Sequence, residues 1–310
     1  MKKVVVTGGA GFIGSHLAEY LSNLNYHVTI IDDLSTGKIS NIQHLLGESN
    51  IEFAQGSITD NSFLQSIFRG VDYVFHQAAI SSVPKSIENP QATHDVNVTG
   101  TLNVLKAAND NRVKKVIYAS SCAIYGDKTV PRIKEDMEPI LQSPYALSKL
   151  AGEYYCQVFH RAYRLPTICL RYFNIYGPKQ DSESLYAAVI PRFIMRVCEN
   201  NPPIILGDGE QTRDFTFIQD VINANILAAE GAATGTYNIG TGEGISINKL
   251  AELIIMLMGI NVQPVYEKPL LGDIRHSIAD ISRSRSFGYK PKWALKEGLR
   301  ETIRAFQNEA

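Results

Sequence analysis

Tyr145 and Lys149 lie four residues apart, directly after Ser143 and Pro144. Serine followed by proline is typical of a helix start, because serine caps free N–H groups and proline fits the first turn. Side chains four residues apart on a helix share one face. A tyrosine becomes a general base when its pKa falls by about 3 units from about 10, which a lysine, a cationic cofactor ring and a helix N-terminus can bring about. The pair therefore predicts proton transfer, although the same spacing also occurs between surface residues of helices without catalytic roles.

A hydroxyl-rich turn, Ser120-Ser121-Cys122-Ala123-Ile124-Tyr125-Gly126, follows the β-branched run from Lys115 to Ala119. Ligands of open α/β sheets bind where the strands end. A serine in this turn can hydrogen-bond the substrate hydroxyl that Tyr145 deprotonates and relay its proton. The turn and the Tyr-Lys pair together predict one catalytic centre.

A glycine-rich loop, Gly8-Gly9-Ala10-Gly11-Phe12-Ile13-Gly14, follows the first apolar run and precedes a helical stretch. Its spacing satisfies G-x-G-x-x-G, the pattern that brings a dinucleotide pyrophosphate to a helix N-terminus. About 20 residues further on, Asp32 and Asp33 end the second predicted strand, where a carboxylate holds the adenosine ribose and repels a 2′-phosphate. We therefore expect NAD rather than NADP, with a solvated turn as the alternative interpretation of the two aspartates.

Strands must alternate with helices to place these motifs at one edge. Short β-branched runs at 4–6, 28–31, 71–75, 115–118 and 167–170 are separated by helix-sized stretches such as 15–24 and 96–108. This alternation predicts a doubly wound α/β fold with a parallel sheet covered on both faces. The pattern loosens after Tyr176, and residues 235–240 suggest a strand that returns to the sheet. We expect a Rossmann-type NAD-binding domain at 1–175 plus roughly 215–245, and a smaller substrate lobe at 176–214 plus roughly 246–310.

The amino-acid composition of the chain limits the classes of molecule that it can bind. The 310 residues carry 30 basic and 31 acidic side chains, a formal net charge of -1, without the electrostatic footprint of a nucleic-acid-binding protein. The four cysteines form no C-x-x-C pair, so we expect no metal site and no disulfide framework. The first apolar run breaks at Thr7 and the run at 253–258 is too short to span a bilayer, so we expect no signal peptide, no membrane contact and a cytoplasmic location.

Ordered blocks along most of the chain resemble the extended short-chain dehydrogenase/reductase family of nucleotide-sugar enzymes. Besides the glycine loop, the turn at 120–126 and the segment 143–149, these blocks are His76-Gln77-Ala78-Ala79, Ser82-Val83-Pro84, Asn97-Val98-Thr99-Gly100, residues 170–178 and Arg213-Asp214-Phe215. Within the family the chain is most similar to the UDP-hexose and UDP-hexosamine 4-epimerases.

The resemblance implies a role for each motif. Ser121 relays the proton, Tyr145 is the base, and Lys149 lowers its pKa and binds the ribose, while NAD oxidises sugar C4 and then reduces it from the other face. The implied NAD-binding residues are Gly8, Gly11, Phe12, Ile13, Gly14, Asp32, Asp33, Ser57, Ile58, Gln77, Ala78, Ala79, Lys85, Asn97, Tyr145, Lys149 and Tyr172. The implied UDP-sugar-binding residues are Lys85, Ser121, Tyr145, Asn174, Ala188, Val189, Arg213, Arg275 and Ser277.

Some positions bear on specificity. Ser57 stands where the family usually has an acid, and Leu270 where it usually has a second phosphate-binding arginine. The resemblance places Ser277 beside the sugar 2-substituent, where a serine leaves room for an N-acetyl group. A 4,6-dehydratase or a UDP-glucuronate decarboxylase would carry an acid after the catalytic serine, where this chain has Cys122 and Ala123. These two enzymes and a non-catalytic NAD sensor are the alternative functions.

The resemblance also implies a homodimer joined through helices near 97–108 and 145–163.

Overall fold

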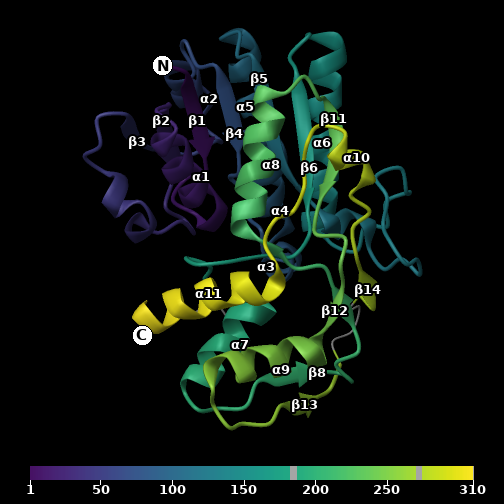
Figure 1. Cartoon of the computed structure of the whole chain (residues 1–310). Coiled ribbons are helices and arrows are strands. Elements are labelled where there is room, and N and C mark those ends of the chain that lie inside the picture. The colour runs from purple at the N-terminus through teal and green to yellow at the C-terminus, as the bar shows by residue number, and fades with distance from the viewer. Residues whose placement is uncertain (182–186, 270–273, 310) are drawn as a thin grey trace.

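The computed structural model describes residues 1–181, 187–269 and 274–309. One large sheet organises the chain (Figure 1), and every strand pair in it is parallel. The predicted doubly wound fold is confirmed, including the return of residues 235–239 to the sheet. In spatial order the strands are β11 (Gly235–Ile239), β6 (Thr167–Tyr172), β5 (Lys115–Ser121), β4 (Tyr73–His76), β1 (Lys3–Thr7), β2 (His27–Asp32) and β3 (Ile51–Gln55).

Alternating side chains of the central strands point into two separate cores. Val4 and Val6 pack with α1 (Phe12–Asn23) and α8 (Ile218–Glu230) on one face of the sheet. Val5 packs on the opposite face, which is covered by α2 (Asn61–Ile67), α5 (Thr101–Asp110) and α6 (Pro144–Ala162). Both faces of the sheet are therefore covered by helices and shielded from water, which explains why the strands are continuous apolar runs.

Short elements carry the connections at the end of the sheet where the strands terminate. The expected helix at 96–108 is divided, because a π-helical turn, η3 (Asp95–Gly100), precedes α5. In this turn Asn97 is buried and hydrogen-bonds the backbone of Ile80. The other short connecting elements are η1 (Ile39–Asn41), η2 (Gln43–Leu45), α3 (Val83–Glu88), α4 (Pro90–His94) and η4 (Cys122–Tyr125).

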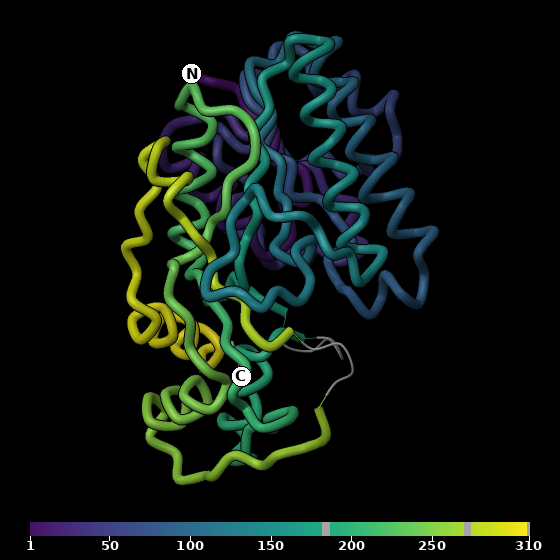
Figure 2. The backbone as a smooth tube through the Cα atoms, turned by 90° about the vertical axis from the view of Figure 1, so that its right-hand side faces the viewer, coloured from purple at the N-terminus to yellow at the C-terminus, as the bar shows by residue number. Residues whose placement is uncertain are grey.

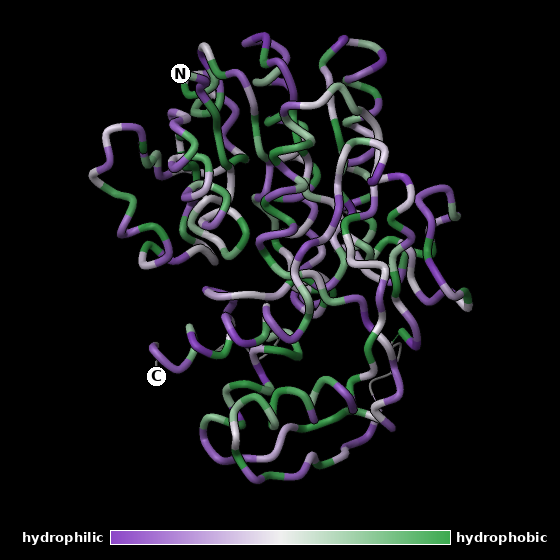
Figure 3. The backbone as a smooth tube through the Cα atoms, in the orientation of Figure 1, coloured by the Kyte–Doolittle hydropathy of each residue, from purple (hydrophilic) through white to green (hydrophobic). Residues whose placement is uncertain are grey.

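A smaller lobe lies below the ends of the strands in both views (Figures 1 and 2). Its C-terminal helix, α11 (Leu295–Glu309), presents Leu299, Ile303 and Phe306 on one buried face. Hydrophilic and hydrophobic residues therefore alternate along this helix in Figure 3. The lobe's elements are β7 (Ile175–Tyr176), α7 (Val189–Cys198), β8 (Ile204–Leu206), β9 (Thr212–Arg213), β10 (Thr216–Phe217), β12 (Ile245–Ser246), α9 (Ile247–Met258), β13 (Val265–Glu267), β14 (His276–Ser277) and α11 (Leu295–Glu309).

The boundary between the two parts runs through the C-terminal region. Helix α10 (Ser282–Arg285), in a range that the sequence assigned to the lobe, packs against β11, and the Ser284 hydroxyl donates to the Asn238 carbonyl. The division into two domains stays a prediction. Within the described ranges, no helix combines the length and apolar content needed to cross a membrane.

Candidate active site

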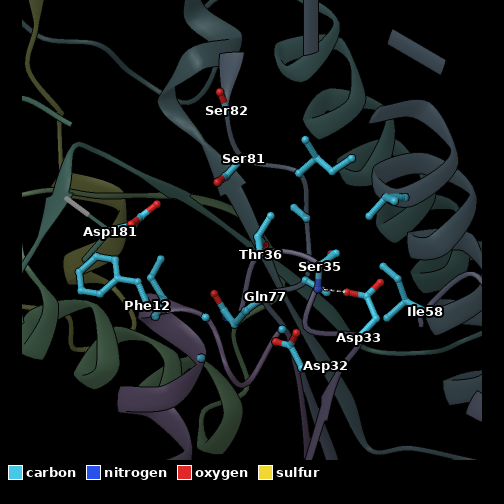
Figure 4. Close-up of a pocket in the computed structure, with 18 of the residues that line it drawn as sticks. Phe12, Asp32, Asp33, Ser35, Thr36, Ile58, Gln77, Ser81, Ser82 and Asp181 are labelled. Carbon is cyan, nitrogen blue, oxygen red and sulfur yellow. Dashed lines mark hydrogen bonds between the residues drawn. The ribbon is translucent and has the colours of Figure 1, made fainter. Parts of the chain in front are cut away.

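A cavity of about 480 Å³ lies at the carboxyl ends of β1, β2 and β4 (Figure 4). It brings together twelve of the residues expected to contact NAD, from the glycine loop, the second strand and the segment after β4. They are Gly8, Gly11, Phe12, Ile13, Gly14, Asp32, Asp33, Ile58, Gln77, Ala78, Ala79 and Lys85. The cavity is also lined by residues to which the sequence analysis gave no role in binding the cofactor: Ser35, Thr36, Ser81, Ser82, Gln180 and Asp181. Ser35-Thr36-Gly37, one residue after the two aspartates, was a signal for the first two of these.

The glycine loop has the geometry of an anion cradle. Gly8 has a positive φ of 67°, and a Cβ there would lie 2.7 Å from the backbone of Ala78. The N-cap of α1 is Gly11, and no side chain caps the helix there. Free N–H groups and the positive end of the helix dipole therefore face the cavity, as a pyrophosphate requires. The cradle and the residues that line the cavity fit a dinucleotide.

The two aspartates after β2 have different surroundings. Asp32 is buried, and its carboxylate accepts hydrogen bonds from the backbone N–H groups of Ala10 and Leu34, both at 2.9 Å. Burial raises the pKa of the Asp32 carboxyl, which these hydrogen bonds counteract. Asp33 is exposed at the cavity and accepts from the Ser35 N–H at 3.0 Å (Figure 4). Asp32 thus also fixes the glycine loop to the end of β2.

Three residues expected at the cofactor lie behind or beside the cavity wall. Tyr172 accepts a hydrogen bond at 2.9 Å from Asn225 of α8, a buried residue that the sequence did not single out. Ser57 hydrogen-bonds Thr59 at 3.0 Å. Asn97 is 1% exposed and holds Ile80, so its amide supports the segment after β4 from behind.

The structure brings Ser121, Tyr145 and Lys149 together. Ser143 caps α6 by accepting from the Ala146 N–H at 3.1 Å, and Pro144 is the first helical residue, as predicted. Ser121 hydrogen-bonds the Tyr145 side chain, which lowers the phenol's pKa, but burial has the larger effect and raises that pKa to about 12. Lys149 donates to the Ala119 carbonyl at 2.9 Å, and burial lowers its pKa to about 8. The ammonium nitrogen lies 5.9 Å from the Tyr145 ring centroid.

A buried ion pair supports this centre from behind. Glu153 and Arg171 form two hydrogen bonds of 2.7 and 2.8 Å, and Ser120 donates to Glu153 at 2.5 Å. Lys149 and Glu153 of α6 therefore hold two successive residues at the end of β5, which fixes the neighbouring Ser121. The sequence analysis missed Glu153, although it follows Lys149 by four residues and so lies on the same helical face.

A second cavity, of about 300 Å³, opens in the smaller lobe. Asn174, Ala188, Val189 and Arg213 line it, as expected of substrate-binding residues. Apolar side chains of the lobe that the sequence did not single out, Phe193, Ile204, Leu206 and Phe215, form much of the remaining wall.

Arg275 and Ser277 lie outside the walls of both cavities. The Arg275 guanidinium forms a bidentate pair with Asp208, with N–O distances of 2.7 and 3.0 Å. This pair lies in a third, open cavity beside Leu206 and Gln211. Ser277 is buried and hydrogen-bonds the thiol of Cys122, the residue after Ser121. Leu270, the expected departure from the arginine pattern, lies outside the described residues.

The NAD dependent epimerase/dehydratase family matches residues 4–240. The chain belongs to this family. NAD is its cofactor, in agreement with the cradle at the end of β1. Within the described ranges, no cluster of His, Cys, Asp and Glu side chains could hold a metal ion.

Members of this family with solved structures share the whole fold. A UDP-N-acetylglucosamine 4-epimerase from Methanobrevibacter ruminantium, in complex with UDP-N-acetylmuramic acid, is 41% identical, with a TM-score of 0.97 over 100% of this chain and 99% of that one. A UDP-glucose 4-epimerase from Thermotoga maritima, with UDP-glucose, is 38% identical, with a TM-score of 0.94 over 99% of each chain. By sequence alone, the chain is also similar to a UDP-N-acetyl-alpha-D-glucosaminuronate decarboxylase from Bacillus cytotoxicus, with 35% identity over 99% of this chain and 98% of that protein.

Proposed function

We propose that this protein is an NAD-dependent 4-epimerase that interconverts UDP-glucose with UDP-galactose and UDP-N-acetylglucosamine with UDP-N-acetylgalactosamine. The observation that carries the proposal is the Ser121, Tyr145 and Lys149 centre at the end of β5 and the start of α6, in a chain that also holds the cofactor cavity and the cavity lined by Arg213. The similarity to 4-epimerases over the whole chain supports it.

The protein's residues orient the sugar and move one proton. Tyr145 accepts the proton of the sugar 4-hydroxyl, and Ser121, already hydrogen-bonded to the phenol, relays it. NAD, held by the glycine loop and the aspartates after β2, would supply the acceptor for the hydride of sugar C4 and the donor that returns it to the opposite face. Lys149 supplies positive charge near the phenolate, and Asn174 and Arg213 hold the nucleotide diphosphate while the 4-keto sugar turns over. When the hydride returns, Tyr145 gives its proton back to the 4-oxygen.

The residues after Ser121 favour epimerisation over the other chemistries of the family. Expulsion of a 6-hydroxyl requires an acid in this turn, and the decarboxylase pattern has a glutamate there. The turn η4 instead offers the thiol of Cys122 and the methyl group of Ala123. The methyl group has no acidic proton, and the thiol is a weak acid whose pKa burial raises further, so neither side chain replaces a carboxylic acid as a proton donor. The dehydratase and decarboxylase alternatives therefore lack their acid.

Two further features belong to the proposal. We infer a homodimer, because α6 exposes Leu147, Tyr154 and Val158, all more than half exposed in the single chain. Leu150 of the same helix is buried in the chain's own core and is not part of this exposed face. We also place the reaction in the cytoplasm, where the four free cysteines stay reduced.

Tyr145→Phe tests the catalytic assignment, because it deletes the base and keeps the ring. Wild-type protein and variant are incubated separately with UDP-glucose and UDP-N-acetylglucosamine, and the epimers are resolved by chromatography. We expect the variant to bind NAD and both substrates while turnover falls by about 10²- to 10⁴-fold. A variant that keeps more than about a tenth of the wild-type rate would show that Tyr145 is not the base.

A further inference from the structure

Asn225 is a buried polar residue to which the proposed mechanism gives no role. It lies in α8, in the part of the helix that packs against the sheet, and is 0% exposed. Val221 and Ala228 of the same helix belong to the hydrophobic core there, so an apolar side chain would satisfy the packing. A buried amide is tolerated where its donors and its acceptor find partners. The partners of Asn225 therefore indicate its function.

The hydrogen bonds of Asn225 fix the orientation of its amide. Its Nδ2 donates to the Val221 carbonyl, one helical turn earlier, at 2.8 Å and to the Tyr172 hydroxyl at 2.9 Å. Because a backbone carbonyl can only accept, this end of the amide must be the NH₂ group. The opposite end, Oδ1, accepts from Nε2 of Gln77 at 3.2 Å. Asn225 thus presents an acceptor to Gln77.

The orientation of the Gln77 amide follows from that of Asn225. The Gln77 atom that faces an acceptor must be the donor Nε2, which also lies 3.3 Å from the Tyr172 hydroxyl. This hydroxyl lies 3.1 Å from Asn225 Oδ1 and 3.4 Å from Gln77 Oε1, so its proton goes to the nearer Asn225 oxygen. Oε1 of Gln77, the negative end of the amide dipole, therefore keeps its lone pairs for a ligand.

Gln77 lies at the catalytic end of the cofactor cavity, whose wall it helps to form (Figure 4). Tyr172, which contacts the Gln77 amide, is the register partner of Ser121 in the sheet. Asp32, expected at the adenosine ribose, ends β2, which lies two strands away from β4 on the other side. The nicotinamide must lie at the Ser121 end, because it exchanges a hydride with the sugar there. The Gln77 oxygen is therefore placed for the nicotinamide half of NAD.

We propose that Asn225 is a positioning residue that directs the Gln77 carbonyl toward the nicotinamide and thereby favours the oxidised cofactor, an inference that rests on the catalytic centre of the proposed function. The oxidised ring carries a positive charge that the reduced ring lacks. A carbonyl oxygen attracts this charge more strongly in a site shielded from water than in water, and it gains little from a neutral ring. The preference serves an epimerase, because a cofactor left reduced cannot begin another turnover.

Two variants remove this arrangement independently. Gln77→Met deletes the amide and keeps a side chain of similar length, and Asn225→Leu removes the group that orients it. Val221→Ala, at a buried residue of the same helix, is the matched control, because it loosens the packing but keeps both amides and the carbonyl that holds Asn225. Calorimetry on protein freed of cofactor gives the dissociation constants of NAD⁺ and NADH, and their ratio cancels any change that affects both forms. The thermal unfolding temperature reports whether each variant is folded.

We expect Gln77→Met and Asn225→Leu to weaken the binding of NAD⁺ about fivefold more than that of NADH, the size of one hydrogen bond. Val221→Ala should leave the ratio unchanged. Should Asn225→Leu fail to fold, Gln77→Met decides the question by itself. Equal weakening of both cofactor forms in folded variants, or no change in either, would overturn the inference and leave the proposed function intact. A wild-type protein that forms no epimer, with the expected shift in the variants, would refute the proposed function and leave the preference for the oxidised cofactor standing.

Discussion

The pKa of Tyr145 lies above that of Lys149, whereas base catalysis needs a deprotonated tyrosine beside a protonated lysine. Burial raises the pKa of Tyr145 to about 12 and lowers that of Lys149 to about 8. At pH values between these two pKa values, both side chains are neutral in the protein without NAD. A phenolate forms only when positive charge is added nearby, and the oxidised nicotinamide of NAD carries such a charge. The site is therefore built so that the base is activated by the cofactor that it serves.

Lys149→Met removes the buried amine while keeping a side chain of similar length. In the protein freed of NAD, wild-type stability relative to the variant should rise as the pH increases from about 8 to 10.5, the ordinary lysine value. In this window the unfolded chain still holds the lysine proton and the folded chain has lost it, so the free energy of unfolding increases, by up to about 1.4 kcal/mol per pH unit. Urea denaturation at several pH values measures the difference, and a constant difference across the window would contradict the lowered pKa of Lys149.

Ser277→Tyr tests which substituent the pocket admits. The family resemblance places Ser277 beside the sugar 2-substituent, where a tyrosine ring would fill the space that a serine leaves free. We expect turnover of the N-acetylated pair to be abolished and turnover of UDP-glucose and UDP-galactose to persist. Separate rate measurements on the two pairs decide this. An equal loss of turnover on both substrate pairs, or no effect on either pair, would show that Ser277 does not select between the sugars.

The positions of residues within helices and strands explain which parts of the candidate site could be predicted from the sequence. The glycine loop, the aspartates and the Tyr-Lys pair were predictable, because each occupies a fixed position at the end of a strand or in the first turns of a helix. The contact of Asn97 with Ile80 was not predictable, because it depends on a π-helical turn that has no signal in the apolar pattern. The pairing of Arg275 with Asp208 joins residues 67 positions apart, so local patterns could not reveal it.

Helix α6 also offers an apolar face for a second copy of the chain. Its exposed side chains Tyr154 and Val158 border an open hollow lined by Gln157 and Arg161. Sedimentation velocity should show a dimer for the wild type and a monomer for Tyr154→Glu combined with Val158→Glu, because two buried charges oppose association. Met256→Glu, at a residue that is 58% exposed on α9, is the matched control and should stay dimeric. A wild-type monomer at micromolar concentration would refute the dimer.

At the scale of the whole molecule, the sheet and the smaller lobe each hold one cavity. The cofactor cavity belongs to the parallel sheet, and the second cavity belongs mainly to the smaller lobe. Gln180 and Ala188, from the segments where the chain enters that lobe, line both cavities. A nucleotide sugar bound in the second cavity would therefore meet NAD at the Ser121 and Tyr145 end of the sheet.

The fate of the hydrogen on sugar C4 tests this account most directly. Purified protein with bound NAD is incubated with UDP-N-acetylglucosamine deuterated at C4, and the products are separated and analysed by NMR and mass spectrometry. The account predicts UDP-N-acetylgalactosamine that keeps its deuterium at C4, because the same hydride is removed and returned. Loss of the deuterium to solvent, its transfer to C6 with loss of water, or the absence of any epimer would contradict it.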